Sequence, residues 1–175
     1  LPGLGQVVNV LVHPTLTILG TGSLLQNTFI SLLRVLLGFL LAAGIAVPLG
    51  LIMGYSSKVE HLLDPCIEIL RPIPPLAWVP LILAWFGIKG VTDLFPSLAD
   101  SMLMSGIQFS TIMIIFIGAF FPVLVNTVQG VKSIPEEYKE SALTLGAGNF
   151  SLLLKVIVPA ALPMIITGLR IGLGI

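Results

Sequence analysis

Glu68 and Arg71 are the charged residues of this chain best placed to do chemistry, because they lie within a long apolar stretch. They are three positions apart, which puts both side chains on one face of a helix. A charge held at membrane depth marks a functional site by default, and a guanidinium there seeks water, a carboxylate or an anion. Two interpretations follow for Arg71: it forms a self-neutralising pair with Glu68, or it contacts an anionic solute.

A cluster of prolines follows this arginine, in the run Arg71-Pro72-Ile73-Pro74-Pro75. Each proline removes a backbone donor and breaks a helix. Irregular backbone at membrane depth is tolerated where it lines a cavity or is buried in protein, and transporters use such breaks at substrate sites. The residues predicted to border a translocation path are Glu68, Arg71, Pro74, Pro75 and Trp78.

Catalytic motifs are missing from the sequence. It has no Gly-x-x-x-x-Gly-Lys-Ser/Thr run for a nucleotide, and no serine, histidine and aspartate pattern typical of a hydrolase. The one cysteine, Cys66, permits no internal disulfide, and the two histidines, His13 and His61, lie far apart. We therefore expect no catalytic residue, no metal site and no cofactor.

The composition points to a membrane as the solvent. Hydrophobic residues make up 56% of the chain and charged residues 9%, with a mean hydropathy of +1.10. Soluble domains carry about 25% charged residues. Eight basic and eight acidic groups give no excess of positive charge for nucleic acid.

The elements that must position the Arg71 region are membrane-spanning helices, each needing about 20 apolar residues. Spans are predicted at Asn27–Tyr55, at Ser110–Gln129 and from Leu162 onward. Pro48 is expected to kink the first of them. A further span, Leu62–Ile88, is interrupted by the prolines, and its part after them is too short to cross alone. The prediction is an all-α polytopic helix bundle, one transmembrane domain over residues 1–175, and a fragment truncated at both ends.

The lysines and arginines set the orientation by the positive-inside rule. The segments Ser56–Arg71 and Gly130–Pro159 hold five of them, whereas the opposite side holds Lys89 alone. This places residues 131–159 in the cytoplasm. The segment Gly90–Ser110 then lies outside, where helical spacing of its apolar residues predicts an amphipathic helix. That helix either docks a binding protein or rests on the bilayer interface.

The cytoplasmic segment has the pattern of a short helix. Ser133 or Pro135 can begin it, and the carboxylates of Glu136 and Glu137 suit the positive end of a helix. The helix is expected to run to Leu145 and to stop at Gly146-Ala147-Gly148, where glycine permits a turn. Its apolar side chains need a partner.

This loop resembles the Glu-Ala-Ala loop of ATP-binding-cassette importer permeases. The family pattern is Glu-Ala-Ala, three residues, Gly, nine residues and Ile-x-Leu-Pro, and here it reads Glu140-Ser141-Ala142, Gly146 and Val156-x-Val158-Pro159. The resemblance implies that residues 136–148 form a coupling helix that docks on a separate ATPase subunit. The implied coupling residues are Glu136, Glu137, Glu140, Ser141, Ala142, Gly146, Ala147 and Pro159.

Other segments are similar to the nitrate, sulfonate, taurine and bicarbonate group of these permeases, above all Arg71–Pro80 and Trp85-Phe86-Gly87-Ile88. The resemblance implies a type I importer permease, multi-pass in a bacterial inner membrane, that carries a small anionic solute by alternating access. Its implied partners are the ATPase subunits, a second permease copy as a homodimer, and an extracytoplasmic solute-binding protein. An ion-coupled secondary transporter or channel is the alternative, although most carboxylates here lie in loops rather than in spans. An intramembrane enzyme would need the catalytic motif that the sequence lacks.

Overall fold

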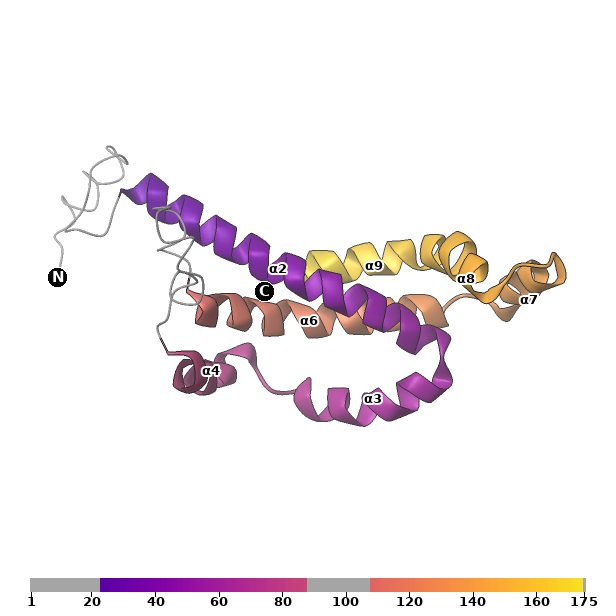
Figure 1. Ribbon diagram of the computed structural model, residues 1–175, viewed down its shortest axis with the longest axis horizontal. Coiled ribbons are helices and arrows are strands. Elements are labelled where there is room, and N and C mark those ends of the chain that lie inside the picture. The colour runs from indigo at the N-terminus through magenta and orange to yellow at the C-terminus, as the bar shows by residue number, and fades with distance from the viewer. Residues whose placement is uncertain (1–22, 88–107, 175) are drawn as a thin grey trace.

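The computed structural model describes residues 23–87 and 108–174, and the elements in these two ranges are helices. Two of the spanning helices are α2 (Leu24–Tyr55) and α6 (Phe109–Lys132). They lie side by side and run in the same direction (Figure 1). Both were predicted from hydropathy within three residues of their ends.

The third long helix returns along α6 in the opposite direction (Figure 1). It consists of α8 (Asn149–Leu152), a π-helical turn (Leu153–Ile157) and α9 (Val158–Leu173), which together make one apolar run of 25 residues. The sequence placed its start near Leu162, which is wrong. The wider π turn carries the helix up to Pro159, which takes a position near the start of α9 where its missing N–H is tolerated.

α2 begins at a side-chain cap and continues through its internal proline. The hydroxyl of Ser23 accepts a hydrogen bond from the N–H of Gln26 at 3.2 Å. Pro48 lies inside the helix, which is continuous across it. The proline therefore does not divide this span, and the kink expected at Pro48 stays a prediction.

Small residues let the three long helices pack backbone to backbone. A Cβ built on Gly50 of α2 would lie 2.7 Å from the Cβ of Thr127 in α6, closer than real Cβ atoms approach. A Cβ on Gly168 of α9 would lie 2.8 Å from that of Asn126. The Gly-x-x-x-Gly spacings in α2 and α9 therefore serve contacts within the chain, with α6 between its two neighbours.

The buried core follows these contacts. Ala46 and Met53 of α2 pack against Val123 and Leu124 of α6. A second cluster joins the end of α6 to the helix from Asn149 onward, and it contains Val131, Ile134, Leu152, Ile157, Ala161 and Ile165. Four of its six residues fall within the segment 131–159 that the sequence placed in the cytoplasm.

The proline-rich region forms a bent arm along the bundle. It consists of α3 (Ser57–Leu70), a 3₁₀ turn (Pro75–Trp78) and α4 (Val79–Phe86), with an 85° bend between its two halves. Figure 1 shows the arm alongside α6, on the side away from α9. The break predicted at the prolines is confirmed, as is the all-α polytopic bundle, whereas the crossing of the membrane by this bent pair stays a prediction.

An amphipathic helix was predicted within Gly90–Ser110, and most of this segment lies outside the described residues. Lys89, the basic residue assigned to the outer side, also lies outside them.

Candidate functional site

The predicted coupling segment forms the helix α7 (Glu136–Thr144), which projects beyond the ends of the long helices (Figure 1). Pro135 occupies its N-cap position, and the carboxylates of Glu136 and Glu137 lie in its first turn. Ser133 has a different role from the one considered for it: it ends α6, and its hydroxyl donates to the carbonyl of Gly130 at 2.9 Å. The helix predicted between the proline and the glycines is confirmed.

α7 ends in a Schellman motif centred on Gly146. This glycine has a φ of +83°, a backbone conformation that L residues rarely adopt. The N–H of Ala147 donates to the carbonyl of Ala142 at 3.0 Å, and that of Gly146 donates to Leu143 at 2.9 Å. The spacing Ala142-x-x-x-Gly146 is thus the spacing that this helix end requires.

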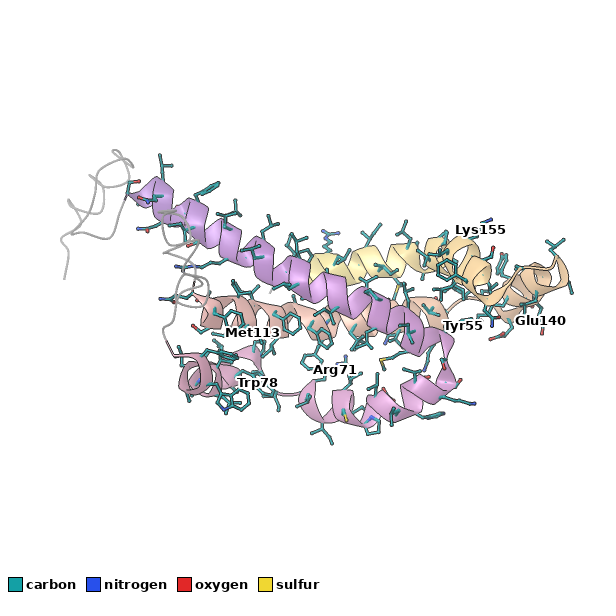
Figure 2. All side chains as sticks on the ribbon, viewed as in Figure 1. Tyr55, Arg71, Trp78, Met113, Glu140 and Lys155 are labelled. Atoms are coloured by element: carbon teal, nitrogen blue, oxygen red, sulfur yellow. The ribbon has the colours of Figure 1, made fainter. Side chains whose placement is uncertain are left out.

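The surface around this turn is apolar and unburied. Leu145 is 88% exposed, Phe150 75% and Tyr138 63%. The side of α7 that carries Ala142 packs instead on the second core cluster. Glu140 and Ser141 are also exposed, and Figure 2 shows Glu140 at the far end of the molecule. Exposed apolar surface of this kind is typical of an interaction site.

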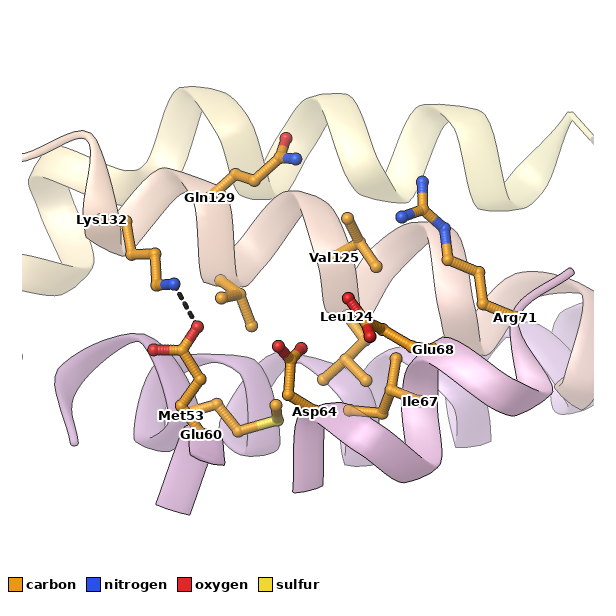
Figure 3. A pocket seen from close by; sticks show the side chains of 11 residues that line it. Met53, Glu60, Asp64, Ile67, Glu68, Arg71, Leu124, Val125, Gln129 and Lys132 are labelled. Carbon is orange, nitrogen blue, oxygen red and sulfur yellow. Dashed lines mark hydrogen bonds and ion pairs between the residues drawn. The ribbon is translucent and has the colours of Figure 1, made fainter. Parts of the chain in front are cut away.

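A polar cavity of about 210 Å³ lies between α3 and α6 (Figure 3). Glu60, Asp64 and Glu68 line it from α3, one helical turn apart, and Lys132 and Gln129 line it from α6. Lys132 forms an ion pair with Glu60.

Arg71 lies where this polar cavity meets a second cavity of about 370 Å³, and it lines both. The second cavity is enclosed by Ile73 and Pro75 of the bent arm and by Phe121 and Asn126 of α6, among others. Figure 2 places Arg71 near the middle of the bundle's length. The second cavity is otherwise mostly apolar, so the guanidinium is its source of positive charge.

Of the two interpretations given for Arg71, the self-neutralising pair with Glu68 is not found. No ion pair joins them in the part of the chain that the structure describes, although both line the polar cavity. Arg71 is the residue at which α3 ends, and Figure 3 shows its guanidinium directed away from α3 toward α6. Helical spacing alone predicted the pair, but the side chain turns where the chain enters the prolines.

A third cavity, of about 460 Å³, is almost wholly apolar and lies between Pro74, Pro75 and Leu76 of the arm and the helices α2, α6 and α9. Four of the five predicted path residues therefore border these three cavities. Trp78 borders none of them, and its indole N–H is buried without an acceptor among the residues described. Asn126 was not among the predicted path residues, although its amide is a polar group within the apolar run Phe109–Lys132 and could have been noticed.

Residues 46–175 match the family model described as "Binding-protein-dependent transport system inner membrane component". The chain belongs to this family. It is 54% identical over 175 residues to a putative ABC transporter permease protein of Methanocaldococcus jannaschii, covering 100% of this chain and 59% of that relative. It is 39% identical over 153 residues to the taurine transport system permease protein of Escherichia coli, covering 87% of this chain and 49% of the relative. It is 39% identical over 152 residues to the bicarbonate transport system permease protein of Synechococcus elongatus, with coverages of 87% and 48%.

The chain thus spans between about half and three-fifths of the length of these relatives. Membership of the family makes it an inner membrane component, and the three long apolar helices and the bent pair agree with a multi-pass protein. The resemblance drawn from the loop and from the arginine–proline region is confirmed at the level of the family.

Proposed function

We propose that this chain is the permease subunit of an ATP-driven importer for a small anionic solute. The observation that carries the proposal is α7 with its Schellman turn, a projecting helix whose exposed apolar side chains need a partner. Relatives named as taurine, bicarbonate and nitrate permeases support the class of solute. ATP hydrolysis takes place in a partner subunit.

The coupling residues divide by face. Ala142 and Ala147 are half-buried, and Ala142 holds α7 to the bundle, whereas Glu137, Glu140 and Ser141 are exposed for contact with the ATPase. Pro159 is separated from them by α8 and the π turn. It lies at the start of α9, where it affects the geometry of that helix rather than the docking face. Tyr138, Leu145 and Phe150 supply the apolar part of the interface.

Arg71 and the turn through Pro74 and Pro75 border the path of the solute. The cavity shared by Arg71 and Asn126 offers a guanidinium and an amide, and an anion at reduced dielectric gains from both. Glu68 and the other carboxylates of the polar cavity repel an anion, which disfavours its entry there and keeps it on the side of Arg71 that faces the second cavity.

Transport proceeds by alternating access. Closure of two ATPase subunits displaces the α7 helices of two permease copies, and the helix bundles reorient around the solute cavity. An extracytoplasmic binding protein delivers the solute on the opposite side.

The test is capture of the ATPase. The full-length permease, purified from a membrane with its ATPase subunits co-expressed, should retain them, and replacing Leu145 and Phe150 together by Asp should release them. A variant with Lys58→Asp, at an exposed and already charged position on α3, should retain them. An intact permease that never retains an ATPase would refute the proposed function.

A further inference from the structure

One side-chain contact joins two elements that are distant in the sequence. Lys132 and Glu60, which form the ion pair in the polar cavity, are 72 positions apart (Figure 3). Leaving Arg34 aside, the other side-chain hydrogen bonds and ion pairs of the described ranges join positions three or four apart. The Lys132–Glu60 pair is therefore the polar link between the bent arm and the bundle.

On the bundle side, this link lies directly beside the coupling segment. Lys132 is the last residue of α6, and α7 begins at Glu136. The connection between them is anchored in the core, because Ile134 is buried in the same core cluster on which Ala142 of α7 packs. A displacement of α7 is therefore transmitted to the end of α6 and to Lys132.

On the arm side, the link holds the start of the helix that ends at Arg71. Glu60 lies in the first turn of α3, and Val59, Leu63 and Ile67 of the same helix pack on the core around Met53. Arg71 follows Glu60 by 11 positions along α3, so the helix would carry a push at Glu60 over about 16 Å to Arg71. The arginine borders the proposed solute cavity.

We propose that Lys132 and Glu60 are positioning residues that transmit the movement of α7 to α3, and so to Arg71 and the proline turn. This inference rests on the proposed function. The Lys132 side chain is half exposed, whereas that of Glu60 is 16% exposed, so the pair lies at the edge of the cavity with one partner in contact with solvent. This position lets Lys132 exchange one carboxylate of α3 for another while the arm and the bundle stay linked.

The carboxylates beyond Glu60 fit a stepwise contact. Asp64 and Glu68 follow it one and two turns along α3 and line the same cavity. Within the described ranges, neither of them is in an ion pair. A displacement of α3 by one helical turn, about 5.4 Å, would bring Asp64 to Lys132 in place of Glu60.

The experiment uses the full permease with its ATPase subunits in proteoliposomes, in a Cys66→Ser background. A cysteine at Val125, which lines both the polar cavity and the Arg71 cavity, is labelled with an impermeant maleimide. The rate of labelling of this cysteine is measured without nucleotide and with ATP plus vanadate, and the two rates are compared. The variants are Lys132→Glu, Glu60→Lys and the double exchange, and Lys58→Glu on the exposed first turn of α3 is the control.

In the unaltered protein and in the control, nucleotide should change the labelling rate. Each single charge reversal should retain the ATPase and hydrolyse ATP. Its change in labelling rate with nucleotide should be about tenfold smaller than in the unaltered protein, which is the usual scale of coupling between sites. The double exchange should restore it. Where a reversal prevents insertion, the neutral Lys132→Gln and Glu60→Gln variants take its place.

A normal response in the single variants would overturn the proposal, and so would failure of the double exchange to restore a lost response. Loss of ATPase capture by the unaltered chain is a separate result, which would refute the proposed function and the coupling through this pair with it.

Discussion

The side-chain amide of Asn126 donates a hydrogen bond to the carbonyl of Pro122, four residues earlier in α6, at 2.8 Å. This bond fixes the amide on the wall of the cavity that Arg71 also lines. One amide hydrogen remains available to a solute, since an amide group has two donors.

Replacing Asn126 by Ala should weaken solute uptake without loss of the ATPase. A hydrogen bond to a charged group contributes about 1.5–3 kcal/mol, which corresponds to about tenfold or more in apparent affinity. Uptake of labelled taurine, nitrate and bicarbonate, each measured in turn, checks this. Unchanged uptake of the transported solute would show that the amide does not face it.

Replacing Arg71 by Gln should abolish uptake, and Arg71→Lys should reduce it, because lysine keeps the charge but loses the planar fork of donors. The exchange Glu68→Arg with Arg71→Glu should fail as well, because the two residues are not paired. Arg170→Gln is the matched control, an exposed arginine of α9 that borders none of the three cavities. Transport by the exchanged pair would restore the structural interpretation of Arg71.

Replacing Gly146 by Ala should impair the coupling to the ATPase, and backbone strain alone should be the cause. No atom lies within 4 Å of the added Cβ, so the penalty is the left-handed conformation, about 1–2 kcal/mol. Gly146→Leu should abolish uptake in a protein that still inserts. Gly148→Ala is the control, because its φ is −72° and the space around it is also open. ATPase retention and uptake are measured together, and equal effects at both glycines would remove the special role of Gly146.

Replacing Gly50 by Ala should destabilise the bundle, because the new methyl meets Thr127 of α6. Overpacking of this kind costs about 1–3 kcal/mol. Gly44→Ala, on the same helix but facing open space, should instead be neutral or stabilising by up to about 1 kcal/mol. Thermal unfolding in detergent compares the two, and a lower Tm for Gly44→Ala than for Gly50→Ala would contradict the packing.

The spanning helices α2 and α6 were predictable because each is a long apolar run with a clear beginning and end. The start of the last helix was not. Lys155 and Pro159 interrupt its hydropathy pattern, and the π turn that carries the helix past them has no clear sequence signal. Local spacing also predicted the end of α7, because the Schellman motif involves neighbours in the chain.

The cavities and the Lys132–Glu60 pair could not be predicted in this way. Both depend on which face of α3 meets α6, and that is set by the bend after Arg71 and by packing on Met53, over large separations in sequence. Spacing along α3 instead favoured a local partner for Arg71. The orientation inferred from the basic residues stays a prediction: Lys132, Lys139 and Lys155 lie at the α7 end of the molecule, whereas Arg71, which was counted with them, does not.

The 85° bend of the arm bears on how the protein is made. Its two halves have 14 and 12 residues, about 21 Å as α-helix for α3 and no more than about 24 Å for the second half, so neither crosses a hydrocarbon core of about 30 Å alone. α3 also carries the acidic residues that line the polar cavity, which cost free energy in lipid until α6 covers them. We therefore expect α2 to leave the insertion machinery first and residues 57–86 to settle into the bilayer only after α6 has arrived, so that the order of insertion departs from the order of synthesis.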